Sequence, residues 1–244
     1  MRVRLAPLLL AASLGIAAPA SAEEFSPAQR QAIVSVLRDA LKQDPSIIRD
    51  ALAAMQADEQ QRQEKVTRDV IAMLGPRLID PADPVAGNPI GDVTVIEFYD
   101  TRCPYCRRMM PVMGELLRAD PNVRIVFKDM PVLGPNSQLE SQALLAAQKQ
   151  GGYFPMQQAI MTAGGTSTRD SLRLTAERIG LDGGKLARDM DEVAIKARLE
   201  ANTQLAQQLG IEGTPAFIVG QRLIAGAADL AEILRAVAEV RASR

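Results

Sequence analysis

Residues 92–106 read DVTVIEFYDTRCPYC and join two different local patterns. The run from Val93 to Tyr99 consists of β-branched, apolar and aromatic residues with one carboxylate, which predicts a buried β-strand. A helix is expected from Cys103 to about Arg118, with a kink at Pro111. The stretch therefore predicts a strand followed closely by a helix whose first turn holds two cysteines.

The two cysteines, Cys103 and Cys106, are the only ones in the chain and are separated by two residues. Cys103 is expected to face the unpaired N–H groups and the positive end of the helix, which favour the thiolate as attacking species. Arg102, Arg107 and Arg108 add positive charge nearby. Cys106 lies one turn further in and is placed to attack a mixed disulfide formed at Cys103. This spacing favours a redox-active pair.

The pair has two other interpretations. A structural disulfide across so small a ring would add only about 2 kcal/mol, less than a staple between distant segments. A metal site needs more ligands, because two thiolates in a chain without histidine supply only half of a tetrahedral site. A metal site shared between subunits remains an alternative. We favour redox chemistry with no bound cofactor or metal.

Glu97 is a carboxylate inside an otherwise apolar strand that points toward the cysteine helix. Burial would raise its pKa, and a protonatable group near the inner thiol would accept the Cys106 proton as a general base. The alternative is a solvated position at a strand edge. We favour the functional interpretation, because charged residues are seldom buried without a partner.

Composition excludes several classes of function. The chain has 244 residues, a formal net charge of −1, 3% aromatic residues and no histidine. Scattered basic residues and few aromatics argue against a nucleic-acid partner. The absence of histidine removes histidine-based catalytic triads and most zinc and copper sites.

The first 22 residues are typical of a secretory signal peptide. Arg2 and Arg4 precede an apolar stretch from Leu5 to Ala18, and Ala20-Ser21-Ala22 matches the pattern for cleavage after Ala22. The alternative is an uncleaved membrane anchor, for which the apolar run is short. We expect export to an oxidising compartment, where disulfide chemistry is normal.

The remaining chain divides into a helical region and an α/β domain. Residues 23–75 have helical periodicity, and residues 80–91 have the proline and glycine content of a linker, so we place a boundary between 85 and 86. We expect further strands at 123–127, 216–219 and 223–225, a last helix at 228–240, and a helical insertion at about 137–209. A capping box formed by Ser137 and Glu140 is expected to start that insertion.

The helices of residues 23–75 carry too few apolar residues to fold alone. Their apolar stripe needs a partner surface, and we favour self-association into a homo-oligomer. The alternative is an arm that docks on its own domain.

Two stretches carry a resemblance to a known family. Gly91-Asp-Val-Thr-Val-Ile-Glu-Phe-Tyr-Asp100 leading into Cys103-Pro-Tyr-Cys106, and Gly210-Ile-Glu-Gly-Thr-Pro-Ala-Phe217, resemble the DsbA-like thioredoxin-fold family over residues 86–244. The resemblance implies an α/β thioredoxin fold with an inserted helical domain. It also implies that the Thr214–Pro215 bond is cis, packs against the active-site disulfide and presents backbone to substrate.

The N-terminal helices narrow the resemblance. Residues 44–52 look like the N-terminal domain of the ScsC group, the suppressor-of-copper-sensitivity proteins. That likeness implies a periplasmic location and, in some members, oligomerisation with disulfide isomerase activity. Pro104 and Tyr105 between the cysteines are expected to modulate the pair. Strongly oxidising members carry histidine where this chain has Tyr105, so we expect a potential between about −120 and about −270 mV.

Three functions remain as hypotheses. The first is an isomerase or reductase of exported proteins with thiols or disulfides, and the second is a monomeric oxidase that introduces disulfides. Either would need a membrane redox partner that reduces or reoxidises it. The third is a binding module or holdase that sequesters copper(I) through the two thiolates, a soft-metal choice that is chemically reasonable.

Overall fold

A computed structural model describes residues 25–243, so the expected signal peptide lies outside the described part. No helix in the described part is long and apolar enough to cross a membrane. The chain divides into two compact units, residues 1–57 and 58–244.

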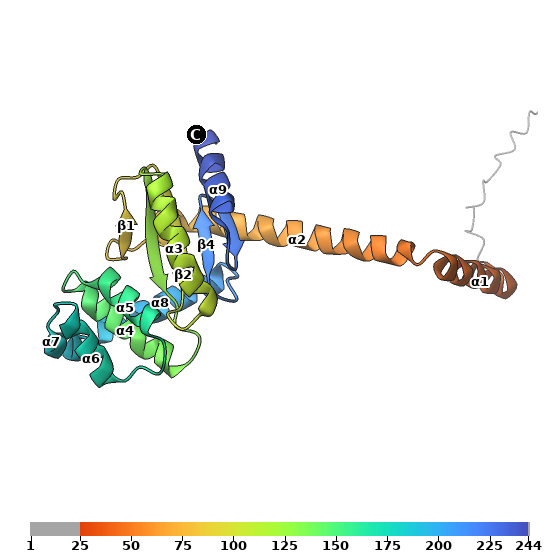
Figure 1. Ribbon diagram of the computed structural model, residues 1–244. Coiled ribbons are helices and arrows are strands. Elements are labelled where there is room, and N and C mark those ends of the chain that lie inside the picture. The colour runs from red at the N-terminus through yellow and green to blue at the C-terminus, as the bar shows by residue number, and fades with distance from the viewer. Residues whose placement is uncertain (1–24, 244) are drawn as a thin grey trace, which may run out of the picture. The chain divides into compact units, whose positions relative to one another are not determined.

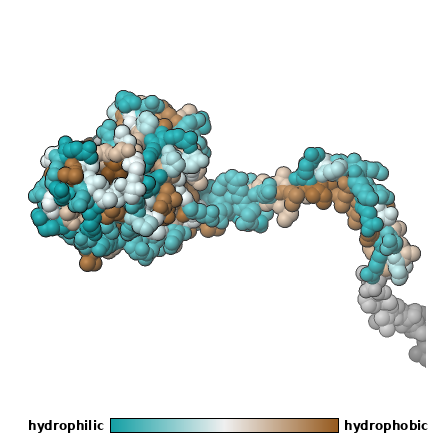
Figure 2. Space-filling model, turned by 60° about the horizontal axis from the view of Figure 1, so that its bottom comes forward, coloured by the Kyte–Doolittle hydropathy of each residue, from teal (hydrophilic) through white to brown (hydrophobic). Residues whose placement is uncertain are grey.

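Helix α1 (Pro27–Gln43) starts at a capping box. The Ser26 hydroxyl accepts from Gln29 N at 3.3 Å, and the Gln29 side chain accepts from Ser26 N at 2.8 Å. Helix α2 (Ser46–Leu74) follows directly and runs into the second unit. Residues 25–57 include no buried position, and Figure 2 shows hydrophobic residues gathered along this helical segment.

The second unit is built on a five-stranded sheet of order β1-β3-β2-β4-β5. Its strands are β1 (Val85–Gly87), β2 (Val93–Tyr99), β3 (Val123–Asp129), β4 (Ala216–Val219) and β5 (Arg222–Ala225). Strands β2 and β3 are parallel, and the other pairs are antiparallel. The β4–β5 hairpin confirms the expected pair of strands after Pro215.

Strand β1 corrects the interpretation of residues 80–91 as a plain linker. Val85 to Gly87 pair with Val126 to Arg124 at the edge of the sheet. The strand is too short for an alternating pattern, and its last residue, Gly87, has φ +82°, which favours glycine. Tertiary pairing, rather than local sequence, makes this segment extended.

Helices cover both faces of the sheet (Figure 1). Helices α3 (Pro104–Ala119) and α9 (Leu230–Ala242) pack on one face, where Val95 and Tyr99 of β2 belong to the larger core. On the other face Ile96 and Phe98 pack with Ile71 and Leu74 from the end of α2. Strand β2 is thus buried on both sides, as its continuous apolar run predicts.

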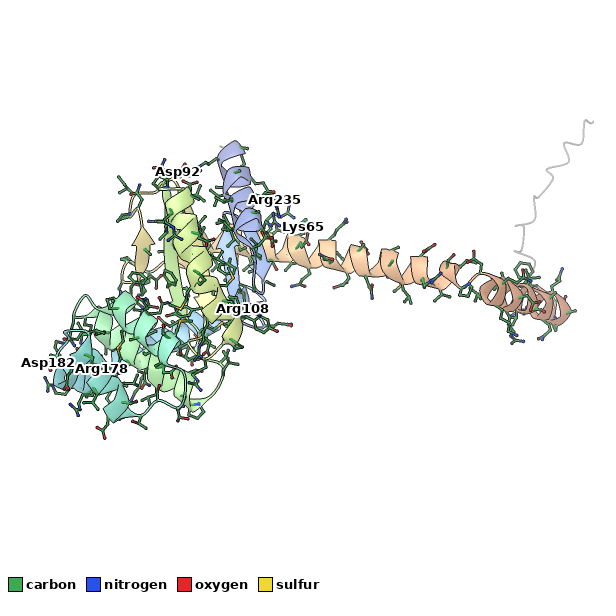
Figure 3. The ribbon with its side chains drawn as sticks, viewed as in Figure 1. Lys65, Asp92, Arg108, Arg178, Asp182 and Arg235 are labelled. Carbon is green, nitrogen blue, oxygen red and sulfur yellow. The ribbon has the colours of Figure 1, made fainter. Side chains whose placement is uncertain are left out.

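Ion pairs of Arg241, near the end of α9, connect this helix to the residue before β2 and to the residue after α3. Arg241 binds Asp92 at 2.7 Å and Asp120 at 2.5 Å, and Figure 3 labels Asp92 beside α9. The Arg241 guanidinium lowers the pKa of Asp120. These contacts hold the last helix against the start of the central strand.

The helical insertion lies between β3 and β4. Its helices are α4 (Pro135–Gln148), α5 (Tyr153–Ala163), α6 (Arg169–Arg178), α7 (Gly183–Asp189) and α8 (Val193–Gln208). The predicted capping box of Ser137 and Glu140 is wrong, because α4 begins at Pro135 after Gly134. Both side chains turn instead toward the loop before Cys103.

Candidate functional site

The two cysteines lie where β2 leads into α3. Cys103 is the N-cap residue of α3, and Cys106 lies in its first turn. Both are free thiols, with 4% and 1% of their surface exposed. The side chains interact with each other, and the Cys103 Sγ donates to the Thr214 carbonyl oxygen at 3.2 Å. The structure therefore brings together both thiols and the loop before β4.

The Thr214–Pro215 peptide bond is cis, as the family resemblance implies. The Pro215 carbonyl accepts from Gly226 N at 2.9 Å, which ties this loop to the end of β5. Thr214 also hydrogen-bonds to the Cys106 side chain. Two loops far apart in sequence thus form one site around the thiols.

Glu97 and Cys106 share a buried environment behind the exposed end of the site. Glu97 lies in the central strand β2 and is 3% exposed, so the solvated-edge interpretation is wrong. Burial raises the pKa of Glu97 to about 8 and also raises the pKa of the Cys106 thiol. Both line a cavity of about 150 Å³ whose other walls are mostly apolar, including Met110, Met113 and Phe154.

Asp100 fixes the loop between β2 and the cysteines. Its fully buried carboxylate accepts from Arg102 N at 2.7 Å and from the Ser137 hydroxyl at 2.8 Å. The other oxygen accepts from Val132 N at 2.9 Å and Leu133 N at 3.0 Å. All four partners are donors, so the carboxylate holds two loops together at the site.

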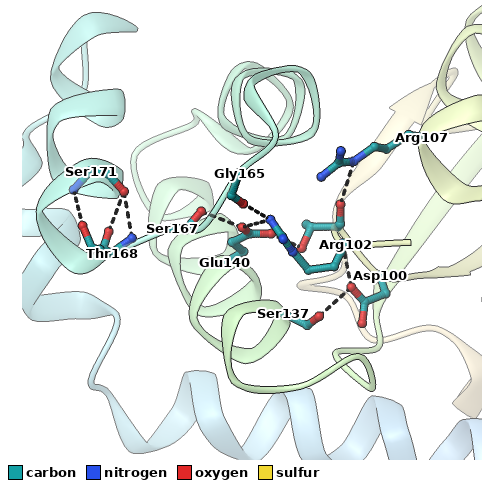
Figure 4. Close-up of polar contacts among 10 residues, drawn as sticks. Asp100, Arg102, Arg107, Ser137, Glu140, Gly165, Ser167, Thr168 and Ser171 are labelled. Atoms are coloured by element: carbon teal, nitrogen blue, oxygen red, sulfur yellow. Dashed lines mark hydrogen bonds and ion pairs between the residues drawn. The ribbon is translucent and has the colours of Figure 1, made fainter. Parts of the chain in front are cut away.

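Glu140 of α4 holds the same loop from the insertion (Figure 4). It is 1% exposed and accepts from the Thr101 hydroxyl and the Ser167 hydroxyl, each at 2.6 Å. Arg102 pairs with it at 3.4 Å and also donates to the Gly165 carbonyl. Arg102 is thereby held between Glu140 and the Gly165 carbonyl.

The residues between the cysteines differ in exposure. Pro104 is the first residue of α3, and Tyr105 is half-exposed beside it. The Arg108 guanidinium, labelled in Figure 3, lies 4.4 Å from the centre of the Tyr105 ring. Arg107 donates to the Thr101 carbonyl at 3.3 Å. Among residues 25–243, no three His, Cys, Asp or Glu side chains are grouped to hold a metal ion.

Comparison with known proteins gives one family. The profile of the DSBA-like thioredoxin domain matches residues 94–238, more than half of the chain. The crystal structure of a thioredoxin-like oxidoreductase from Silicibacter pomeroyi is 42% identical, with a TM-score of 0.64, and the match covers 66% of this chain and 94% of that one. The catalytic domain of Proteus mirabilis ScsC is 26% identical, with a TM-score of 0.63, and covers 70% of this chain and 97% of that one.

The first curated relatives are longer proteins. A Na⁺/H⁺ antiporter NhaA of Salinispora arenicola is 29% identical over 175 residues, which is 70% of this chain. The chain spans about a quarter of that relative's length, 26% of it.

Proposed function

The chain belongs to the family of DSBA-like thioredoxin domains, and from that premise we propose that it is an exported thiol–disulfide oxidoreductase acting on protein substrates. One observation carries the proposal. Cys103 and Cys106 are free thiols in the first turn of α3, with the Cys103 Sγ against the Thr214 carbonyl at 3.2 Å. The ScsC catalytic domain and the Silicibacter oxidoreductase, which share this fold, support it.

The exchange takes two steps. The Cys103 thiolate attacks one sulfur of a substrate disulfide, forms a mixed disulfide and releases the other substrate sulfur as a thiolate. Cys106 then loses its proton to the Glu97 carboxylate and attacks the Cys103 sulfur. The second substrate sulfur leaves, so the substrate disulfide is reduced to two thiols while Cys103 and Cys106 become a disulfide. The reverse sequence introduces a disulfide into the substrate.

The groups around the thiols have separate tasks in this proposal. Glu97 accepts the Cys106 proton, and its burial beside the cavity keeps it protonatable near neutral pH. Thr214 and Pro215 present main chain to the substrate beside Cys103. Pro104 and Tyr105 tune the pair, with Tyr105 stacked under Arg108 at the exposed side.

We further propose that the protein works as a disulfide isomerase or reductase in the periplasm, as a homo-oligomer assembled through residues 23–75. The exposed apolar residues of the first unit support this, among them Leu37 and Leu52, which are 56% and 53% exposed. A reduced Cys103 requires a membrane redox partner that supplies electrons. Exported proteins with incorrect disulfides are the substrates.

Insulin reduction tests the assignment of Cys103. The Cys103→Ser variant is expected to lose insulin reduction, and Cys106→Ser is expected to accumulate mixed disulfides that the wild type resolves. Insulin reduction retained by Cys103→Ser would exclude Cys103 as the nucleophile.

Trapping the thiols in living cells tests the direction of exchange. An isomerase is expected to be found with Cys103 and Cys106 reduced. A fully oxidised pair would support the monomeric oxidase instead.

A further inference from the structure

A closed ring of three oxygen contacts lies beside the proposed site and has no part in the exchange steps above. The Tyr99 hydroxyl lies 3.0 Å from Asp129 Oδ1, and the Tyr153 hydroxyl lies 2.9 Å from Asp129 Oδ2. The two hydroxyls are 2.6 Å from each other. All three residues are at most 3% exposed.

Counting hydrogens constrains the charge of this ring. Each of the three contacts is a hydrogen-bond distance and needs one hydrogen between its two oxygens. The two tyrosines bring one hydroxyl hydrogen each, and an ionised aspartate brings none. If Asp129 is ionised, one contact places two oxygen lone pairs against each other. If Asp129 is protonated, three hydrogens serve three contacts and the ring closes.

The ring adjoins the cavity behind the resolving thiol. Tyr99 lines that cavity together with Glu97, Cys106 and Gln157, and Gln157 also hydrogen-bonds to the Tyr99 hydroxyl. Tyr99 pairs with Asp129 across β2 and β3, two residues along each strand from Glu97 and its partner. Glu97 and Tyr99 therefore project from the same face of the sheet.

We propose that Asp129 carries a proton in the resting protein, closes a three-proton ring with Tyr99 and Tyr153, and so keeps a second negative charge away from the Glu97 and Cys106 cavity. Its role in exchange rests on the proposed function, and in that role Asp129 is a positioning residue. The neutral ring leaves a single negative charge to pass between Cys106 and Glu97 during resolution.

The surroundings of Asp129 agree with a neutral carboxyl. Burial raises the pKa of Asp129 to about 7, against the opposing effects of Tyr153, Tyr99 and Arg198. The charged groups that act on its pKa are Arg198 of α8, which lowers it, and Asp83 before β1, which raises it. Arg198 and Lys128 bind Asp83 at 3.0 and 2.5 Å, so neither cation is paired with Asp129.

The variant Asp129→Asn tests the proton in the ring. Asparagine has the shape of a protonated aspartate and accepts through its oxygen, and one of its two N–H groups can replace the carboxyl hydrogen, so each of the three contacts keeps one hydrogen. We expect this variant to unfold at the wild-type temperature or above it at pH 5. Because the folded pKa lies above the unfolded value of 3.8, wild-type stability falls as pH rises toward about 7, and the gap between the proteins widens over that range and then levels off.

Asp100→Asn is the matched control. Asp100 is also buried at the end of β2, but a backbone N–H faces each of its oxygens. The asparagine side chain has an NH2 group in place of one of these oxygens, and that NH2 group would face a backbone N–H. This variant is therefore expected to unfold at a lower temperature than the wild type at every pH. If Asp129→Asn also unfolds at a lower temperature at pH 5, the protonated ring is wrong. Infrared spectra with labelled aspartate give a second check, since a protonated aspartyl carboxyl at pH 6 must be present in the wild type and absent in Asp129→Asn.

The pH profile of resolution tests the positioning role. A fluorescent thiol is attached to Cys103 as a mixed disulfide, and its release by Cys106 is followed against pH. Above about pH 7 the wild type loses the Asp129 proton, and the ionised carboxylate then opposes loss of the Cys106 proton. Asp129→Asn stays neutral over the whole range, so it is expected to move the midpoint of release down by about one pH unit. An unchanged midpoint overturns the positioning role. Failure of the wild type to form the mixed disulfide or release its thiol would instead overturn the proposed function.

Discussion

Glu97 is a residue whose surroundings change its chemistry by burial alone. It lies in the central strand, and burial raises its pKa from 4.5 to about 8. The same low-polarity environment raises the pKa of the Cys106 thiol, which must lose a proton before it can attack. One buried acid and one buried thiol at a shared cavity thus match the needs of a proton transfer during exchange.

The variant Glu97→Gln is expected to be more stable than the wild type and slower in exchange. Because the folded pKa of Glu97 exceeds its unfolded value, Glu97 lowers stability as pH rises from about 4.5 to about 8. Glutamine removes that loss, which is on the order of 3 kcal/mol at pH 7. Release of a mixed disulfide by Cys106 should slow roughly 10²-fold. Urea unfolding at pH 5 and pH 8 and a release assay measure the two effects.

Glu115→Gln on the exposed side of α3 is the control for Glu97→Gln, with no change expected in either measurement. Equal pH dependence of stability in the wild type and Glu97→Gln would contradict the raised pKa of Glu97. If Glu97→Gln releases the mixed disulfide at the wild-type rate, Glu97 is excluded as the proton acceptor.

At the residue scale the sequence pointed to residues that the structure brings together around the two cysteines. The Cys-Pro-Tyr-Cys spacing led to the thiols, an isolated carboxylate in an apolar strand led to Glu97, and the family resemblance led to Thr214 and Pro215. Asp100 and Asp129 were missed. Asp100 follows β2 and Asp129 is the last residue of β3, places where a polar residue also suits a loop. Their contacts depend on partners more than 20 residues away.

At the scale of elements, hydrogen bonds and an ion pair hold α4 against the loop before Cys103. Glu140 receives hydrogen bonds from Thr101 and Ser167 and pairs with Arg102, so the insertion positions the loop that leads to the catalytic helix. The Arg102 guanidinium and the Thr101 and Ser167 hydroxyls all donate to this carboxylate, and its negative charge strengthens each of these hydrogen bonds. Glutamine at this position removes the charge that strengthens these hydrogen bonds and pairs with Arg102, and it leaves its amide nitrogen only hydroxyl oxygens as acceptors.

Glu140→Gln is therefore expected to lower the free energy of unfolding by about 2–3 kcal/mol. Equilibrium unfolding in urea measures the loss. Glu177→Gln, which removes an exposed pair with Arg173 on α6, is the control and should change stability by less than about 0.5 kcal/mol. Similar losses for both variants would mean that Glu140 does not hold the loop.

Helix ends can be read from the sequence where a glycine follows the helix. Gly151, Gly180 and Gly210 all have positive φ and stand two or three residues after the last residues of α4, α6 and α8. The expected N-cap of α4 at Ser137 lies three residues after the observed one at Gly134, because Ser137 and Glu140 have the spacing of a capping box but bind Asp100 and Thr101 instead. A local pattern cannot distinguish a cap from a tertiary contact of the same residues.

At the scale of the whole molecule, the helices within residues 23–75 have one part that is buried in a core and one part whose apolar residues are exposed. Ile71 and Leu74, at the end of α2, are buried with Ile96 and Phe98 and belong to the core of the second unit. The apolar residues of α1 and of the first turns of α2 remain exposed, including Leu37 and Leu52. A deletion of residues 23–75 would therefore damage the core as well as remove the proposed association surface.

Association is better tested by a deletion that ends at residue 57, where the first unit ends. Under the proposed self-association, the mature chain runs as an oligomer in sedimentation, and the chain starting at residue 58 runs as a folded monomer that still reduces insulin.

Leu37→Glu with Leu52→Glu should also produce a monomer, since each places a charge on an apolar face that has to be buried on assembly. Arg38→Glu with Arg49→Glu, at positions that are already charged, is the matched control and should stay oligomeric. If the mature wild type is itself a monomer, the exposed apolar face has another partner, and isomerase activity that depends on paired active sites is excluded.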